Sequence, residues 1–283
     1  MNAQKRSEAV LITGCSTGIG RATAEHLAKR GHTVYATARR LDSIRDLEAA
    51  GCKLLALDVN DENSMAAAVR QVEEAEGAVE VLVNNAGYSQ SGAVESVPMD
   101  EVRRQFETNV FGLVRMCQLV LPGMRRQHWG RIVNLSSMGG RLVFPGGGFY
   151  HGTKYAVEAI SDALRFEVKD FGVDVILIEP GLIKTEFGET AAKATGGGEG
   201  DYADFNKAVA EATAGAYEGP TMRLGGGPDD VARKIEKAIG ARRPKARYPV
   251  TASARILLTQ RALLPDRGWD LFVGTQFPRP GKG

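Results

Sequence analysis

The sequence predicts a doubly wound α/β fold, in which a mostly parallel sheet is flanked by helices. Short runs rich in Val, Ile and Leu alternate with longer stretches that carry apolar residues at helical spacing. Most of the short runs are almost continuously apolar, as expected of parallel strands that are buried on both faces. This alternation implies right-handed crossovers between strands and therefore one sheet with helices on its two sides.

Six strands and five helices are predicted in the first two thirds of the chain. The strands are Ala9–Thr13, His32–Thr37, Lys53–Leu57, Val79–Asn84, Arg131–Leu135 and Val173–Ile178. The helices are Gly18–Arg30, Leu41–Ala50, Asp61–Ala75, Met99–Arg126 and Tyr150–Phe171. Ligands of such sheets bind beyond the carboxyl ends of the strands, so a functional site is expected there.

The last hundred residues show no domain boundary, so residues 1–283 are expected to form a single domain. Residues 186–227 are rich in Gly and Ala, with glycine runs at Gly196–Gly198 and Gly225–Gly227 and no clear strand. Residues 228–283 are predicted to form mainly C-terminal helices. These elements are the helices Pro228–Ala241 and Ala252–Leu264 and a short strand at Ala246–Val250.

The composition excludes several classes of protein. Hydrophobic residues at 43% and charged residues at 25% are typical of a globular chain, and a net charge of +2 does not suggest a nucleic-acid partner. No apolar run approaches the ~20 residues that cross a bilayer, and Met1–Glu8 lacks the core of a signal peptide. The three cysteines suggest no disulfide framework, and the four histidines show no metal-ligand spacing. We therefore expect a cytoplasmic protein without a metal.

The first predicted strand runs into a helix through a glycine-rich turn. Over Thr13–Gly20 this turn reads Thr-Gly-Cys-Ser-Thr-Gly-Ile-Gly, a GxxxGxG spacing. Glycines here let the backbone approach a pyrophosphate, and the helix N-terminus supplies N–H groups and a positive dipole end. The turn indicates a Rossmann-type dinucleotide site, the alternative being a purely structural turn. The residues expected to contact the cofactor are Gly14, Ser16, Thr17, Gly18, Ile19 and Gly20.

The second strand favours NADP(H) over NAD. It leads into Arg39 and Arg40 with no acid at its tip, and Asp42 falls in the first turn of the next helix. A guanidinium binds a phosphate in a bidentate manner, whereas a carboxylate at this place suits the ribose diol of NAD. We predict that Arg39 binds the 2′-phosphate, the alternative being that both arginines are solvated surface residues.

A second irregular turn, Asn84–Gly87, closes the fourth predicted strand. Asn side chains brace irregular backbone through local hydrogen bonds, so a structural role is one interpretation. The same brace would form the floor of the cofactor cleft. We predict that Asn85, Ala86 and Gly87 contact the cofactor.

The strongest indication of a catalytic site is the set Ser137, Tyr150 and Lys154. Ser137 follows the fifth strand, and Lys154 lies four residues after Tyr150 on the same helical face. A positive charge ~4 Å away favours a phenolate by ~4 kcal/mol at an effective dielectric of ~20, about three pKa units. We therefore expect the pKa of Tyr150 to fall towards neutrality for acid–base catalysis, while Ser137 holds a substrate carbonyl. Alone, a Tyr-x-x-x-Lys pair is usually a core residue beside a surface one.

With these motifs in order, the sequence resembles the short-chain dehydrogenase/reductase family over roughly residues 9–239. The resemblance implies that Asp58 and Val59 contact the adenine, and that Asn109 completes a catalytic tetrad by holding a water that relays protons to Lys154. Tyr150 and Lys154 would also contact the cofactor, Lys154 through the nicotinamide ribose. Thr185 and the backbone of Ile183 would bind the carboxamide. The last of the matching motifs begins with Pro180 and Gly181. The matching motifs are Thr13–Gly20, Asp58, Asn84–Gly87, Asn109, Ser137, Tyr150–Lys154 and Pro180–Thr185.

Within the family, Val34–Arg39 and the tail Leu264–Arg267 are similar to hydroxysteroid 17β-dehydrogenases, retinol dehydrogenases and acyl-dihydroxyacetone-phosphate reductases. This resemblance implies an NADP(H)-dependent oxidoreductase of lipid metabolism, which interconverts a hydrophobic ketone or aldehyde and its alcohol. His151, beside the tyrosine, is interpreted as a helix-surface residue, the alternative being a residue that takes part at the site. The alternative function is a non-catalytic dinucleotide-binding regulator on the same fold, which has no need of a complete tetrad.

Residues 186–227 follow the nicotinamide motif directly and are expected to cover the substrate as a lid. Phe187, Tyr202, Phe205 and Tyr217 would wall a hydrophobic pocket, the alternative being a disordered surface insertion. The chain beyond this segment carries 12 basic and 5 acidic residues. Its last helix would lie on an anionic membrane surface or pack against the body or a second subunit. We also expect a homo-oligomer.

Overall fold

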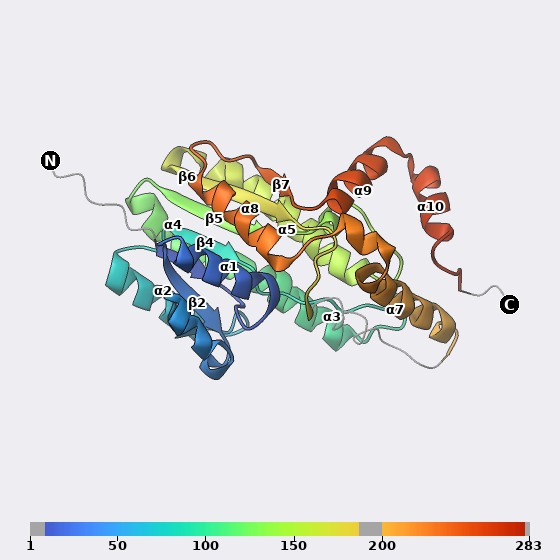
Figure 1. The fold of residues 1–283 in the computed structure, drawn as a ribbon, viewed down its shortest axis with the longest axis horizontal. Helices are drawn as coiled ribbons and strands as arrows, with labels where there is room; N and C mark the ends of the chain where they lie inside the picture. Colours follow the sequence, from blue (N-terminus) through green and yellow to red (C-terminus); the bar gives the residue numbers. More distant parts are fainter. Residues whose placement is uncertain (1–8, 187–199, 281–283) are drawn as a thin grey trace.

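A seven-stranded parallel sheet forms the centre of the molecule, with helices on both faces (Figure 1). The computed structural model describes residues 9–186 and 200–280. Neighbouring strands pair in parallel in the order β3-β2-β1-β4-β5-β6-β7. The doubly wound α/β fold is therefore confirmed. The strands are β1 Ala9–Ile12, β2 Thr33–Ala38, β3 Lys53–Ala56, β4 Val81–Asn84, β5 Gly130–Leu135, β6 Val173–Glu179 and β7 Arg247–Pro249.

The helices alternate with the strands along the chain. None of those within the described ranges is long and apolar enough to cross a membrane. The α-helices are α1 Gly18–Lys29, α2 Glu62–Glu76, α3 Met99–Phe106, α4 Gly112–Arg126, α5 Gly148–Glu167, α7 Ala203–Glu218, α8 Pro228–Gly240, α9 Ala252–Leu263 and α10 Asp266–Gly274. The shorter helical turns are η1 Leu41–Ala50, η2 Glu107–Phe111, η3 Met138–Gly140, η4 Lys169–Phe171 and η5 Pro220–Leu224.

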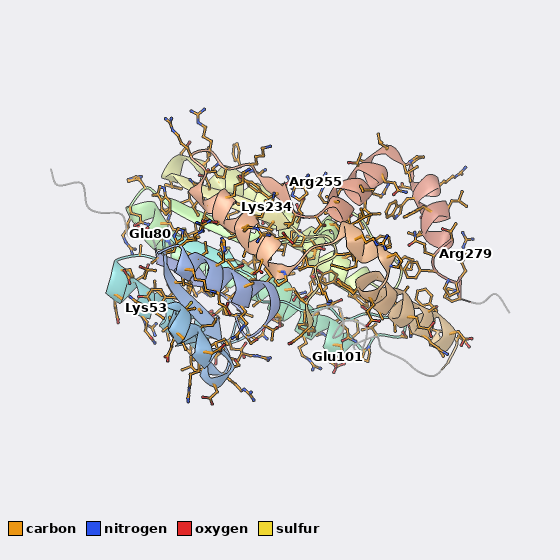
Figure 2. The ribbon with its side chains drawn as sticks, viewed as in Figure 1. Lys53, Glu80, Glu101, Lys234, Arg255 and Arg279 are labelled. Atoms are coloured by element: carbon orange, nitrogen blue, oxygen red, sulfur yellow. The ribbon has the colours of Figure 1, made fainter. Side chains whose placement is uncertain are left out.

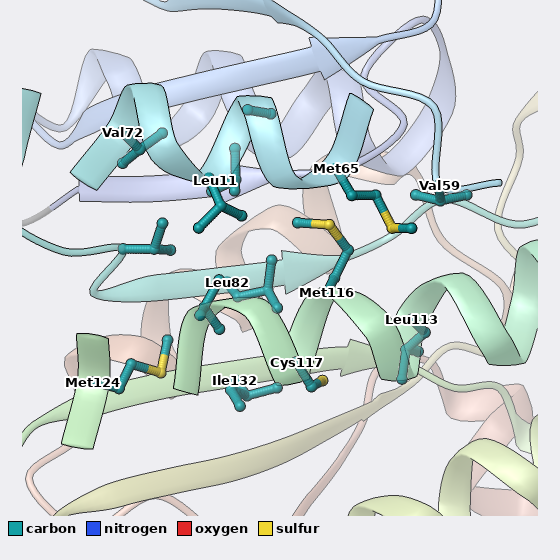
Figure 3. Packing of buried hydrophobic residues seen from close by; sticks show 14 of the residues in the cluster. Leu11, Val59, Met65, Val72, Leu82, Leu113, Met116, Cys117, Met124 and Ile132 are labelled. Atoms are coloured by element: carbon teal, nitrogen blue, oxygen red, sulfur yellow. The ribbon is translucent and has the colours of Figure 1, made fainter. Parts of the chain in front are cut away.

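Successive residues of the central strands face opposite layers of helices, which explains their continuous apolar runs. Leu11 of β1 lies in a buried cluster with Met65 of α2 and Met116 of α4 (Figure 3). Ile12, the next residue, lies in a second cluster with Leu27 of α1, on the other face. Both faces of β1 are thus covered, as its sequence predicts.

Three departures from the predicted helices bear on the site. The single helix predicted over Met99–Arg126 is interrupted by the π-helical turn η2, which contains Asn109. Residues 41–50 form a 3-10 helix. The stretch 186–227, for which the sequence suggested no regular element, contains α7 and η5. The Ala-rich sequence of α7 has a high helix propensity, which the glycine runs on either side of it concealed.

Charged side chains cover the outer surface and protect the exposed edge of the sheet (Figure 2). Lys53 lies on the edge strand β3, and its Nζ is 2.7 Å from Oε1 of Glu76 on α2. A lysine on an edge strand discourages pairing with a strand of another molecule. The carboxyl ends of the strands are where a ligand is expected, because helices cover both faces of the sheet.

Candidate active site

A cavity of about 1610 Å³ opens at the carboxyl ends of the strands. It collects residues from the turns after β1, β2, β3, β4, β5 and β6, which lie far apart in the sequence. Of the predicted site residues, Gly20 and Asn109 do not line it. Those that do are Gly14, Ser16, Thr17, Gly18, Ile19, Arg39, Asp58, Val59, Asn85, Ala86, Gly87, Ser137, Tyr150, Lys154, Pro180, Gly181, Ile183 and Thr185.

The glycine-rich turn has the close packing that a dinucleotide loop needs. Gly14 and Gly18 have φ values of +73° and +58°, in the left-handed region that favours glycine. A Cβ on Gly14 would lie 2.9 Å from the Cα of Ala86, and one on Gly20 would lie 2.3 Å from Nδ2 of Asn85. Gly20 therefore has a packing role, because the absence of a side chain lets the turn lie against the loop after β4. The turn leaves backbone at the cavity beside the start of α1, which fits a pyrophosphate.

The turn after β4 is both a brace and a cavity wall. Oγ1 of Thr13 accepts hydrogen bonds from the backbone N–H groups of Asn85 and Ala86, each at 3.0 Å. Nδ2 of Asn85 donates to the carbonyl oxygens of Thr13 and Gly14, each at 2.9 Å. Asn85 and Ala86 also line the cavity. The motif is therefore a structural brace that also lines the cavity, and its contact with a cofactor stays a prediction.

Thr13→Val is expected to lower the free energy of unfolding by about 1–3 kcal/mol, because two partly buried N–H groups lose their acceptor while the side-chain shape is kept. Urea denaturation measures this change. Thr23→Val is the matched control. The Thr23 hydroxyl is buried and has no hydrogen-bond partner among the described residues, so its removal should be neutral or stabilising. Equal losses in the two variants would contradict the bracing role of Thr13.

Two arginines stand where the cofactor's ribose is expected. Arg39 and Arg40 follow β2, are exposed, and line the cavity with Ser16 and Ser43. Asp42 does not line the cavity, and Oδ1 of this residue is 2.6 Å from the Arg45 guanidinium. This arrangement supplies cationic and hydroxyl groups that suit a phosphate.

Ser137, Tyr150 and Lys154 meet at the cavity, beyond β5. Oγ of Ser137 accepts from the backbone N–H of Gly139 at 3.0 Å and shares a hydrogen bond with Tyr150. Nζ of Lys154 donates to the carbonyl oxygen of Leu135 at 2.8 Å and lies 5.8 Å from the centroid of the Tyr150 ring. Ser137 directly follows β5, and α5 carries Tyr150 and Lys154, so the packing of α5 beside the end of β5 brings the three side chains together.

The structure reverses the expected direction of the pKa of Tyr150. Burial raises the pKa of this phenol, the negative charge of an ionised Tyr217 would raise it further, and the hydrogen bond with Ser137 opposes both. Burial also lowers the pKa of Lys154 to about 8, against the attraction of Glu158. The expectation of a near-neutral pKa was wrong because it counted the Lys154 charge and omitted desolvation. Tyr150 is therefore protonated at neutral pH, the form that donates a proton.

Asn109 braces the site from outside the cavity. Nδ2 of Asn109 donates to the carbonyl oxygen of Tyr88 at 2.8 Å and to Oγ1 of Thr153 at 3.2 Å. Its Oδ1 accepts from the backbone N–H of Tyr88 at 3.0 Å. The side chain thus ties the turn after β4 to α5. The water-holding role that the resemblance implies stays a prediction.

Two interpretations of the sequence are corrected by the structure. His151 is buried, not on the helix surface, and its ring lies between α5 and the loop after η3.

In the expected lid, Tyr217 lines the cavity but Tyr202 and Phe205 do not. Gly226 pairs with the backbone beyond β6, donating to Leu182 and accepting from Lys184. Phe187 and Gly196–Gly198 lie outside the described residues.

Sequence reasoning missed the residues that form the apolar part of the cavity. Its lining includes side chains of α9, α10 and the residues just after α10, which only the tertiary structure brings over the active site. Their apolar side chains are consistent with core packing, so no signal in the sequence distinguishes them. They include Ile256, Leu257, Phe272 and Phe277, with Phe144 from the loop after η3.

Comparison with known proteins agrees with this geometry. Residues 8–196 match the family described as short chain dehydrogenase. A 3-ketodihydrosphingosine reductase of Bacteroides thetaiotaomicron is 42% identical over 197 residues, covering 69% of this chain and 71% of the relative. An NADPH-dependent 3-dehydrocapnine reductase of Ornithobacterium rhinotracheale is 34% identical, covering 92% of this chain and 94% of the relative.

The fold agrees as well. The crystal structure of a short-chain dehydrogenase from Streptomyces avermitilis superposes with a TM-score of 0.78 at 35% identity, covering 90% of this chain and 93% of that one. The glycine-rich turn, the brace after β4 and the meeting of Ser137, Tyr150 and Lys154 lie within the matched residues. The chain therefore belongs to the short-chain dehydrogenase/reductase family and is an oxidoreductase.

Proposed function

We propose that this protein is an NADP(H)-dependent reductase that converts a hydrophobic ketone or aldehyde to its alcohol. The observation that carries the proposal is the meeting of Tyr150, Ser137 and Lys154 at a cavity that also holds a dinucleotide-type glycine turn. A protonated phenol and a serine hydroxyl are the two groups that a carbonyl oxygen needs when it gains negative charge.

The chemistry divides between the cofactor and the chain. Bound NADPH supplies the hydride. Tyr150 gives its phenolic proton to the carbonyl oxygen of the substrate, and the hydroxyl of Ser137 donates a hydrogen bond to the same oxygen. Lys154 stabilises the phenolate that Tyr150 leaves behind, because its ammonium lies 5.8 Å from the ring in a buried site. Burial of Tyr150 favours the return of a proton and so prepares the next turnover.

NADP(H) is proposed over NAD because Arg39 and Arg40, directly after β2, line the cavity together with Ser16 and Ser43, and no carboxylate of β2 or η1 lines it. The relative from Ornithobacterium rhinotracheale, named as NADPH-dependent, supports the same preference. Reduction is the proposed direction because cells generally keep NADP in its reduced form.

A lipophilic substrate is proposed from the composition of the cavity wall. Phe144, Leu257, Phe272 and Phe277 line the part of the cavity beyond the catalytic residues. Pockets lined by aromatic and aliphatic side chains bind apolar ligands through buried area. The relative from Bacteroides thetaiotaomicron, named for 3-ketodihydrosphingosine, supports a substrate of lipid metabolism, as do the branches to which the sequence is similar.

A panel of aldehydes and ketones of increasing chain length tests the proposed function. Purified protein is mixed with NADPH or NADH, and the loss of the reduced-nicotinamide absorbance is followed. We expect NADPH to be consumed and KM to fall as the apolar chain lengthens from butanal to dodecanal. If no member of the panel oxidises either cofactor, the proposed function is wrong.

A further inference from the structure

The imidazole of His151 bridges the catalytic helix and the loop that follows η3. Its Nδ1 lies 2.9 Å from the carbonyl oxygen of Gly139, and its Nε2 lies 3.3 Å from the backbone nitrogen of Phe144. A carbonyl oxygen only accepts and a backbone N–H only donates, so Nδ1 carries the hydrogen and Nε2 is the acceptor. Burial lowers the pKa of His151, which favours this neutral form.

The chain leaves a slot for this ring by placing glycine on both sides of it. A Cβ on Gly139 would lie 2.4 Å from Nδ1 of His151, and one on Gly147 would lie 2.7 Å from Nε2. Neither glycine has a positive φ, so backbone conformation does not explain them. The absence of a side chain at these two positions is what allows the ring to lie between loop and helix.

The same loop is held from its other side by α10. Nε1 of Trp269 donates to the carbonyl oxygen of Val143 at 3.1 Å. The ring centroid of Phe144 lies 6.3 Å from that of His151, 5.8 Å from that of Trp269 and 6.5 Å from that of Phe277. Phe144, His151 and Phe277 all line the cavity. The loop is thus clamped between the helix that carries Tyr150 and the C-terminal helix.

We propose that His151 is a positioning residue that determines specificity for long apolar substrates. Its hydrogen bond to Phe144 holds residues 141–147 against Trp269 of α10, and this contact forms the cavity wall on which the apolar part of a substrate packs. His151 acts through Phe144 and not on the reacting carbonyl, so it affects binding of the chain of a substrate and not the chemical step. The substrate class rests on the proposed function.

Two conservative variants separate the two hydrogen bonds. In His151→Gln the side-chain amide reaches the place of Nε2 and accepts from the Phe144 N–H, whereas in His151→Asn it reaches only the place of Nδ1. Losing the partly buried hydrogen bond to Phe144 is expected to raise KM for dodecanal about tenfold in His151→Asn, with kcat and the KM for butanal unchanged. His151→Gln should stay near wild type. Trp269→Phe, which removes the bond to Val143 and keeps a smaller aromatic ring beside Phe144, should also raise KM for dodecanal.

Leu271→Ala is the matched control, because Leu271 is exposed on the same helix as Trp269 and does not line the cavity. It should change neither KM. A merely structural role of His151 would lower the melting temperature and reduce turnover of both aldehydes alike. That result, or equal behaviour of the Asn and Gln variants, would overturn the proposal.

Amide hydrogen exchange, measured on the protein without ligands, tests the role of His151 independently of the proposed function. The amide of Phe144 should exchange about tenfold faster in His151→Asn than in the wild type or in His151→Gln. If the wild type reduces neither aldehyde, the proposed function fails, and the exchange rates alone decide whether the clamp exists. Unchanged protection of the Phe144 amide in His151→Asn would refute it.

Discussion

Tyr150→Phe is expected to lower kcat for carbonyl reduction by about 10²–10⁴-fold, the range typical of a lost general acid. The substitution removes the phenolic oxygen and keeps the ring, so the packing beside His151 is preserved. Cofactor affinity should stay within a few-fold of the wild type, because the glycine turn and the arginines after β2 are untouched. Stopped-flow measurement of NADPH oxidation, with cofactor titration by fluorescence, reports the two quantities separately.

Tyr155→Phe is the matched control for this variant. Tyr155 lies one residue after Lys154 on α5, but it is 43% exposed and does not line the cavity. The same atom is removed from the same helix, so loss of activity in both variants would point to damage to α5. A Tyr150→Phe enzyme that keeps a tenth of the wild-type kcat would show that another group supplies the proton.

The arrangement of the sheet was predictable because its strands are buried on both faces. Every residue of β1 and β5 is buried. β1 is wholly apolar and β5 has only Arg131 and Asn134 as polar residues, so neither strand alternates between apolar and polar positions, as expected of strands covered on both faces. The turns after these strands were predictable for a related reason. Polar or glycine residues that directly follow a buried strand must lie at the carboxyl edge, where Gly14 and Ser137 indeed line the cavity.

The sequence could not predict features that depend on contacts between distant segments. The break at Asn109 has no proline to mark it, and Gly112 follows it only where α4 begins. The break accompanies hydrogen bonds of Asn109 to Tyr88 and Thr153, which the fold brings close. His151 looked like a surface residue because its slot depends on Gly139 of η3, a distant element, as well as on Gly147 at the N-cap of α5. The pKa of Tyr150 depends on desolvation, which no spacing of residues encodes.

The preference for NADPH over NADH is expected to fall by about 10²-fold in Arg39→Asp. A hydrogen-bonded ion pair contributes ~1.5–3 kcal/mol, so its loss alone changes affinity by about 10- to 150-fold, and the new carboxylate adds repulsion of the 2′-phosphate. The same carboxylate can accept hydrogen bonds from the free ribose diol of NADH. Both effects move the ratio of kcat/KM for the two cofactors in one direction.

Arg45→Asp provides the control for charge alone. Arg45 lies in η1, six residues after Arg39, does not line the cavity, and is paired with Asp42 at the surface. The two variants have the same net charge, so long-range attraction of the phosphate weakens similarly in both and is further reduced by salt. Only Arg39→Asp should lose the preference when the assay is repeated at high ionic strength. A preference that survives in Arg39→Asp would assign phosphate binding to Arg40, and the double variant Arg39→Asp with Arg40→Asp would then be the one that loses it.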